Sequence, residues 1–73
     1  MSRVFYHGHT IEFMGDQARP TGWLLRARIH RRVPEGIECR DVYPQDPVVV
    51  QTREEAEARS FMIGMRAVDH PSH

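Results

Sequence analysis

The sequence contains no lysine and no asparagine, and it has a single cysteine. All ten basic residues are arginine, whose planar guanidinium suits paired contacts to carboxylates and phosphates, although a GC-rich genome would produce the same bias. Cys39 has no second cysteine to bridge to, which is typical of a reducing compartment. No apolar run reaches signal-peptide length or the roughly 18 positions of a membrane span. We therefore expect a cytoplasmic protein.

The chain has 73 residues, enough for one small domain with a modest core. A domain of this size buries only about 60 % of the surface that its unfolded chain exposes, so a metal or a partner subunit often supplements the core. We expect a single domain over residues 1–73, with an ordered core from about residue 4 to 69 and a tail over 70–73. The formal net charge is zero, which gives no general attraction to nucleic acid or membrane.

Alternation of apolar and polar side chains predicts strands in the first half of the chain. From Thr10 to Met14, Ile11 and Phe13 share one face. From Trp23 to Val33, apolar residues occupy one face and basic residues the other, which predicts one long central strand. The polar stretch Gly15–Gly22 between them is a predicted loop.

A hairpin is predicted after the central strand. Pro34 fixes the first turn position and Gly36 tolerates a positive φ, which favours a three-residue loop with Val33 opposite Ile37. This register places Ile37 and Cys39 on the apolar face, so side-chain parity supports it. It pairs Arg31 with Cys39, Ile29 with Asp41, Arg32 with Glu38, and His30 with Arg40.

Thr52 to about Asp69 forms a predicted amphipathic helix. The sequence Thr-Arg-Glu-Glu at its start is a capping box, in which Thr52 accepts from the Glu55 amide and the Glu55 carboxylate reaches back. Pro71 disfavours helical geometry at His70. The helix should pack on the sheet through its small residues, with a bulky group beside them that a three-stranded sheet covers incompletely. The small residues are Ala56, Ser60, Gly64 and Ala67; the bulky group is Phe61, Met65 and Val68.

These elements predict an α+β fold, an antiparallel β-meander with one C-terminal helix packed on one face. The meander has three predicted strands. Val48–Val50 is either a short fourth strand or an extended approach to the helix. The bulky group Phe61, Met65 and Val68 is then the best candidate for self-association, with a homodimer as one outcome.

No constellation in the sequence names a reaction. His7 and His9 would point to one side of an extended segment, but a zinc-type pattern of further ligands is missing, so we expect neither a metal site nor a cofactor. Cys39 beside a histidine and Asp41 has the residue types of a nucleophile, base and orienter. Its parity instead predicts a small buried thiol. We therefore expect a non-enzymatic protein.

The outward face of the predicted sheet is basic. Side chains two apart along a strand stand about 6.6 Å from each other, close to phosphate spacing, so such a row suits a nucleic-acid backbone. Against this, Glu38 is expected to neutralise Arg32, and an antiparallel sheet needs one solvated face in any case. The candidate nucleic-acid-binding residues are Arg26, Arg28, His30, Arg32 and Arg40.

The segments Tyr6–Ile11, Gly22–Trp23, Thr52–Ala56 and Ala67–Asp69 form a pattern that resembles small uncharacterised bacterial β-β-β-α domains and, more distantly, the HlyU-like family, whose name suggests transcriptional activation. The order is also similar to the DNA-binding domains of plant ethylene-response factors and of some integrase arm-binding domains. There, arginines on the exposed sheet face read the major groove, which implies that role for Arg26, Arg28 and Arg40.

Two hypotheses follow from these features. The first is a non-enzymatic protein-interaction or regulatory module whose partner is another protein or a second copy of itself. The alternative is a module that binds nucleic acid through the basic sheet face.

Overall fold

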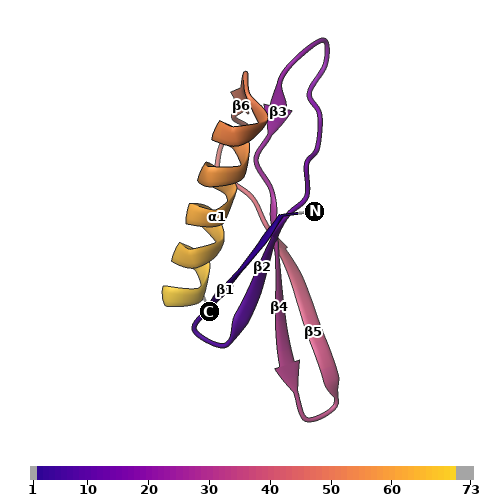
Figure 1. The fold of residues 1–73 in the computed structure, drawn as a ribbon, viewed down its shortest axis with the longest axis vertical. Helices are drawn as coiled ribbons and strands as arrows, with labels where there is room; N and C mark the ends of the chain where they lie inside the picture. The colour runs from indigo at the N-terminus through magenta and orange to yellow at the C-terminus, as the bar shows by residue number, and fades with distance from the viewer. Residues whose placement is uncertain (1, 71–73) are drawn as a thin grey trace.

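The computed structural model describes residues 2–70 and confirms the predicted α+β fold (Figure 1). The sheet has four antiparallel strands in the order β1-β2-β4-β5, two further strands pair separately, and one helix packs against the sheet. Within residues 2–70 no helix is long and apolar enough to span a membrane. Residues 71–73 of the predicted tail lie outside the described part. The elements are β1 (Arg3–Tyr6), β2 (His9–Phe13), β3 (Trp23–Leu24), β4 (Ala27–Val33), β5 (Gly36–Val42), β6 (Val49–Val50) and α1 (Arg53–Asp69).

Helix α1 begins where the capping box predicts. The Thr52 hydroxyl accepts a hydrogen bond from the Glu55 amide at 3.1 Å, which satisfies one of the free N–H groups of the first turn. The Glu55 carboxylate does not reach back to Thr52 as predicted but lies 3.4 Å from Arg59 one turn later, an exposed contact. At the other end, the His70 amide donates to the Arg66 carbonyl at 2.9 Å. Both ends of the helix agree with the sequence prediction.

The small residues of α1 let the helix backbone lie directly against the sheet. Ala56 and Ser60 are completely buried, and Gly64 is buried between them and the end of the helix. A methyl group at Gly64 would stand only 2.6 Å from Cγ2 of Ile11 on β2. The Ser60 hydroxyl accepts a hydrogen bond from the Arg26 amide at 3.1 Å. The predicted contact through small residues is confirmed.

The core consists of two apolar clusters that Phe61 connects. Met65 and Val68 are half-buried and pack against the second cluster together with Val4 and Tyr6 of β1. The bulky group of the helix is therefore largely used within the chain, because β1 widens the sheet beyond the three strands that the prediction counted. The buried residues are Phe13, Leu25, Val50 and Ala56 in the first cluster, and Ile11, Ala27 and Ile29 in the second.

The His-Gly-His sequence forms the turn of the β1–β2 hairpin. His7 and Gly8 have φ values of 48° and 76°, as a two-residue primed turn requires, and Tyr6 pairs with His9 across it. The expected extended segment with both imidazoles on one side is therefore wrong. Residues 2–70 contain no group of three or more His, Cys, Asp or Glu side chains that could hold a metal ion. The Tyr6 hydroxyl donates to Asp69 at 2.7 Å and ties this hairpin to the helix.

The predicted register of the β4–β5 hairpin is wrong by one residue. Val33 pairs with Gly36 around a two-residue turn, which places Ile37 and Cys39 on the face away from the helix. Figure 1 shows that this hairpin projects past the end of α1, and Ile37 is 68 % exposed. Both faces of the tip are solvated, so burial parity could not set the register there. The observed pairs include Arg31 with Glu38, His30 with Cys39, Ile29 with Arg40, Arg28 with Asp41, and Ala27 with Val42.

The predicted central strand Trp23–Val33 is interrupted at Leu25 and Arg26. At this point the Arg26 amide donates to Ser60 of the helix, and its carbonyl accepts from the Met14 amide at 3.3 Å. The backbone thus leaves the pairing of β3 with β6 and enters the four-stranded sheet. Leu25 is buried at the interruption, as its parity predicts.

The close approach at Gly64 predicts the effect of Gly64→Ala. Helix propensity alone would stabilise the protein by about 1 kcal/mol, but overpacking a dense core costs roughly 1–3 kcal/mol. Because Ile11 is fully buried and cannot move aside, we expect the free energy of unfolding to fall by about 1 kcal/mol net. Urea denaturation measures this. The exposed Ala58→Gly variant provides the propensity scale, and a more stable Gly64→Ala variant would contradict the prediction.

Candidate functional site

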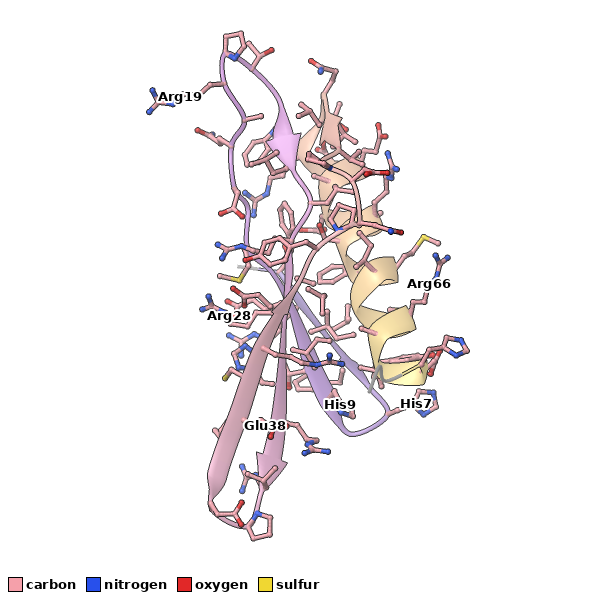
Figure 2. The ribbon with its side chains drawn as sticks, turned by 180° about the vertical axis from the view of Figure 1, so that it is seen from behind. His7, His9, Arg19, Arg28, Glu38 and Arg66 are labelled. Carbon is pink, nitrogen blue, oxygen red and sulfur yellow. The ribbon has the colours of Figure 1, made fainter. Side chains whose placement is uncertain are left out.

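The sheet has one face covered by α1 and one face away from it, here called the open face. In Figure 2 Arg28 lies on the open face and Arg66 lies on the helix. Of the candidate nucleic-acid-binding residues, Arg28, His30 and Arg32 share the open face, and Arg26 joins Arg28 there through a common carboxylate. Strand β5 contributes Ile37, Cys39 and Asp41 to the same face.

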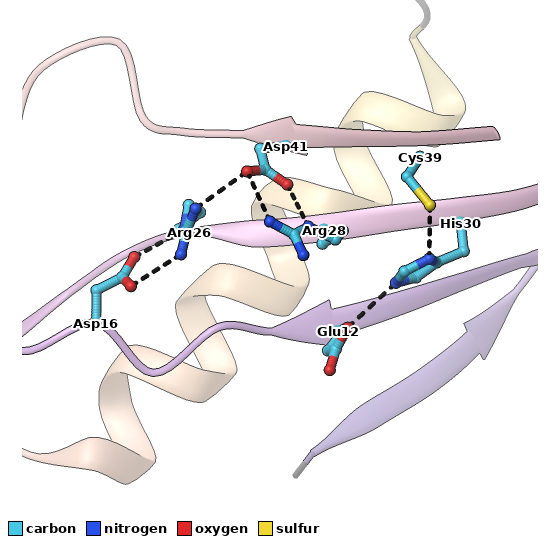
Figure 3. Close-up of polar contacts among 7 residues, drawn as sticks. All are labelled: Glu12, Asp16, Arg26, Arg28, His30, Cys39 and Asp41. Atoms are coloured by element: carbon cyan, nitrogen blue, oxygen red, sulfur yellow. Dashed lines mark hydrogen bonds and ion pairs between the residues drawn. The ribbon is translucent and has the colours of Figure 1, made fainter.

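Two carboxylates hold the first two arginines of the open face (Figure 3). Arg28 Nε donates to Asp41 at 2.7 Å, and Arg26 donates to the same carboxylate at 3.0 Å. Arg26 also donates to Asp16 at 2.9 Å through Nη2. The hydrogen bond from Arg28 keeps the pKa of Asp41 below its ordinary value, and the charges of both arginines act in the same direction. Asp41 pairs with Arg28 rather than with the predicted Ile29, and a phosphate group would have to compete with these carboxylates for Arg26 and Arg28.

Arg40 lies on the other side of the sheet from the arginines with which it was grouped. The one-residue change of register turns Arg40 toward the helix, where it donates to the Ala67 carbonyl at 3.3 Å. Glu38 changes face for the same reason and pairs with Arg31 at 2.9 Å. The predicted Arg32–Glu38 pair is therefore wrong. Arg32 forms no ion pair within residues 2–70, and it is the one exposed cation among the candidates that stays on the open face without such a partner.

His30 lies between two side chains of neighbouring strands. Its Nδ1 is 3.0 Å from Cys39 Sγ on β5, and its Nε2 is 3.1 Å from a Glu12 oxygen on β2 (Figure 3). Cys39 is exposed, so the predicted buried thiol is wrong. The sequence predicts Asp41 as the orienter beside the cysteine and a histidine, but the side chain that contacts His30 is Glu12. Only the register of two strand pairs brings these three together.

A groove of about 790 Å³ runs between α1 and the C-terminal part of β5. Its floor is apolar and three arginines border it, and among residues 2–70 no aspartate or glutamate lines it. Met62 of the helix and Tyr43 after β5 border it with 58 % and 61 % of their surfaces exposed. The sequence alone could not predict the groove, because it forms only where β5 and the segment after it lie beside α1. The floor includes Leu25, Val42 and Ile63, and the arginines are Arg40, Arg59 and Arg66.

The lowered pKa of Asp41 predicts how stability depends on pH. A carboxylate whose folded-state pKa lies below its ordinary value of 3.8 stabilises the fold fully above that value, and this contribution is lost as the pH falls further. We expect Asp41→Asn to lower the free energy of unfolding at neutral pH and to flatten its decrease below pH 3.8. Urea denaturation over a pH series measures both. Asp46→Asn, in an exposed loop, should leave the profile unchanged.

Comparison with known proteins gives no relative from which to transfer a function. No protein-family model, no curated protein and no solved structure matches the chain. The resemblance to HlyU-like and similar small domains therefore stays a prediction.

Proposed function

We propose that this protein is a non-enzymatic protein-interaction module that binds an acidic, partly apolar segment of a partner protein in the groove between α1 and β5. The observation that carries the proposal is the composition of the groove in the described part of the chain, with an apolar floor, three arginines and no aspartate or glutamate. Apolar burial supplies affinity, and arginines at the rim select carboxylates and speed up association.

The residue types around the groove are those enriched at protein interfaces. Tyrosine, methionine and arginine are over-represented there, and Tyr43, Met62 and Arg59 border this groove. Arginines near a helix C-terminus also interact favourably with the helix dipole, which explains in part why Arg66 and Arg40 lie there. The dipole does not account for Arg59, which lies near the middle of α1 and has only a 3.4 Å exposed contact to Glu55.

The alternative, nucleic-acid binding through the open face, has less support. Asp41 engages both Arg26 and Arg28, and Arg40 lies on the covered side. A phosphate backbone would have to compete with carboxylates already in place, and the formal net charge of zero adds no general attraction. The proposal includes a cytoplasmic location, supported by one cysteine without a disulfide partner in the chain.

A short fluorescent peptide that alternates glutamate and leucine tests the groove directly. We expect this peptide to bind in fluorescence anisotropy titrations, and a matched peptide of lysine and leucine to bind much more weakly. Arg59→Gln and Arg66→Gln should each weaken binding by up to about fivefold, because an exposed ion pair contributes roughly 0.2–1 kcal/mol. Added salt should weaken it further.

Arg32→Gln is the matched control, since Arg32 lies on the open face and should not affect the peptide. Equal binding of the acidic and basic peptides, or full affinity in the Arg59→Gln, Arg66→Gln double variant, would refute the proposal. Sedimentation of the free protein completes the test. A dimer that the double variant dissociates would mean that a second copy, rather than another protein, occupies the groove.

A further inference from the structure

The contacts of His30 determine which ring nitrogen carries its proton. An ionised carboxylate only accepts hydrogen bonds, so the 3.1 Å contact with Glu12 requires the proton of the neutral imidazole on Nε2. The lone pair of Nδ1 is then directed at Cys39 Sγ, 3.0 Å away. The imidazole is thus prepared to accept the thiol proton. The Glu12 side chain is 15 % exposed and that of His30 29 %, so both are partly shielded, whereas Cys39 is exposed.

We propose that Cys39, His30 and Glu12 form a reactive thiol site on the open face that undergoes exchange with small disulfides. The thiol proton passes from Cys39 Sγ to His30 Nδ1, and the thiolate attacks one sulfur of the disulfide. A bond forms between Cys39 Sγ and that sulfur as the original sulfur–sulfur bond breaks. The leaving thiolate takes the electron pair of the broken bond and the proton from His30. Glu12 acts as a positioning residue that stabilises the imidazolium formed in between.

Thiol–disulfide exchange fits an open site better than acyl transfer does. Exchange needs an accessible thiol and a neighbouring base that takes its proton and returns it to the leaving sulfur. Cys39 is exposed, and His30 Nδ1 lies 3.0 Å from its sulfur. Acyl transfer also needs hydrogen-bond donors directed at a developing oxyanion. Arg28 on the same face is not directed at such a position, because it already donates to Asp41. The site is separate from the groove between α1 and β5, because Cys39 points to the opposite side of the sheet from Arg40.

The charged groups that face this site come from each strand of the sheet. Arg3 on β1 borders a shallow hollow that Glu12 and His30 also line, and Arg28 and Arg32 flank His30 along β4. Asp41 follows two positions after Cys39 on β5 and is engaged by Arg28. The proton transfers of the thiol site are therefore assigned to its own three side chains, because Asp41 on the same face is already paired.

The rate of reaction with dithiodipyridine, an uncharged aromatic disulfide, tests the site through the absorbance of the released thiopyridone. Since the chain has one cysteine, the signal reports on Cys39 alone. At neutral pH a free thiol is only a few per cent ionised, so a base that takes the thiol proton raises the reaction rate. The gain is limited because a less basic thiolate is a weaker nucleophile. We therefore expect the parent to react about fivefold faster than His30→Gln. Glu12→Gln should lie between them. At strongly alkaline pH, where thiols ionise without a base, all three rates should converge.

Glu38→Gln is the matched control, because Glu38 lies on β5 next to Cys39 but on the opposite face. It should react like the parent. The proposal is overturned if the parent reacts no faster than His30→Gln at neutral pH, or if their difference persists unchanged at alkaline pH. Nitrogen NMR of the parent provides a test that needs no variant. It should show His30 protonated on Nε2, and a proton on Nδ1 instead would also overturn the proposal.

Discussion

The contact on which the rest of the structure depends is the close approach of α1 to β2 and β4 through small side chains. Gly64 leaves no room for a methyl group against Ile11, and Ser60 is completely buried in the same contact. With a bulkier residue at either position the helix would have to move outward, and both apolar clusters would lose their cover. A chain that buries so little surface has few other contacts to compensate for such a shift.

This contact also places the polar groups on the far side of the sheet. The Ser60 hydroxyl binds the Arg26 amide at the interruption between β3 and β4, and so fixes where the four-stranded sheet begins. From this fixed point the guanidinium of Arg26 reaches Asp16 and Asp41 on the open face. The helix thus helps to position side chains that it does not touch, because Arg26 contacts the helix through its backbone and the open face through its side chain.

The sequence predicted those parts of the fold that burial or local chemistry determines. The helix follows from its capping box and small residues, and β2 follows from the alternation around Ile11 and Phe13, which are both buried. The hairpin register could not be predicted, because Ile37 and Cys39 are apolar residues at a tip where neither face is covered. At the base of the hairpin, Arg28 pairs with Asp41 and Ala27 with Val42. These pairs set the register, but they can be recognised only once the strands are placed in the fold.

The register of one strand therefore decides which chemistry each face of the protein carries. In the predicted register Cys39 would face the helix as a buried, inert thiol. Arg40 would lie beside His30 on the open face and extend a row of basic side chains. In the observed register Cys39 meets His30 on the open face, and Arg40 turns toward the groove beside α1. Because side chains alternate strictly along a strand, no local adjustment exchanges these two residues without moving all of β5. The ion pair of Arg28 with Asp41 opposes that movement, since a one-residue slip would put the two charges on opposite faces of the sheet. The packing of Val42 beside the buried Ala27 opposes it as well, so both pairs at the base of the hairpin keep the thiol and the groove on separate surfaces.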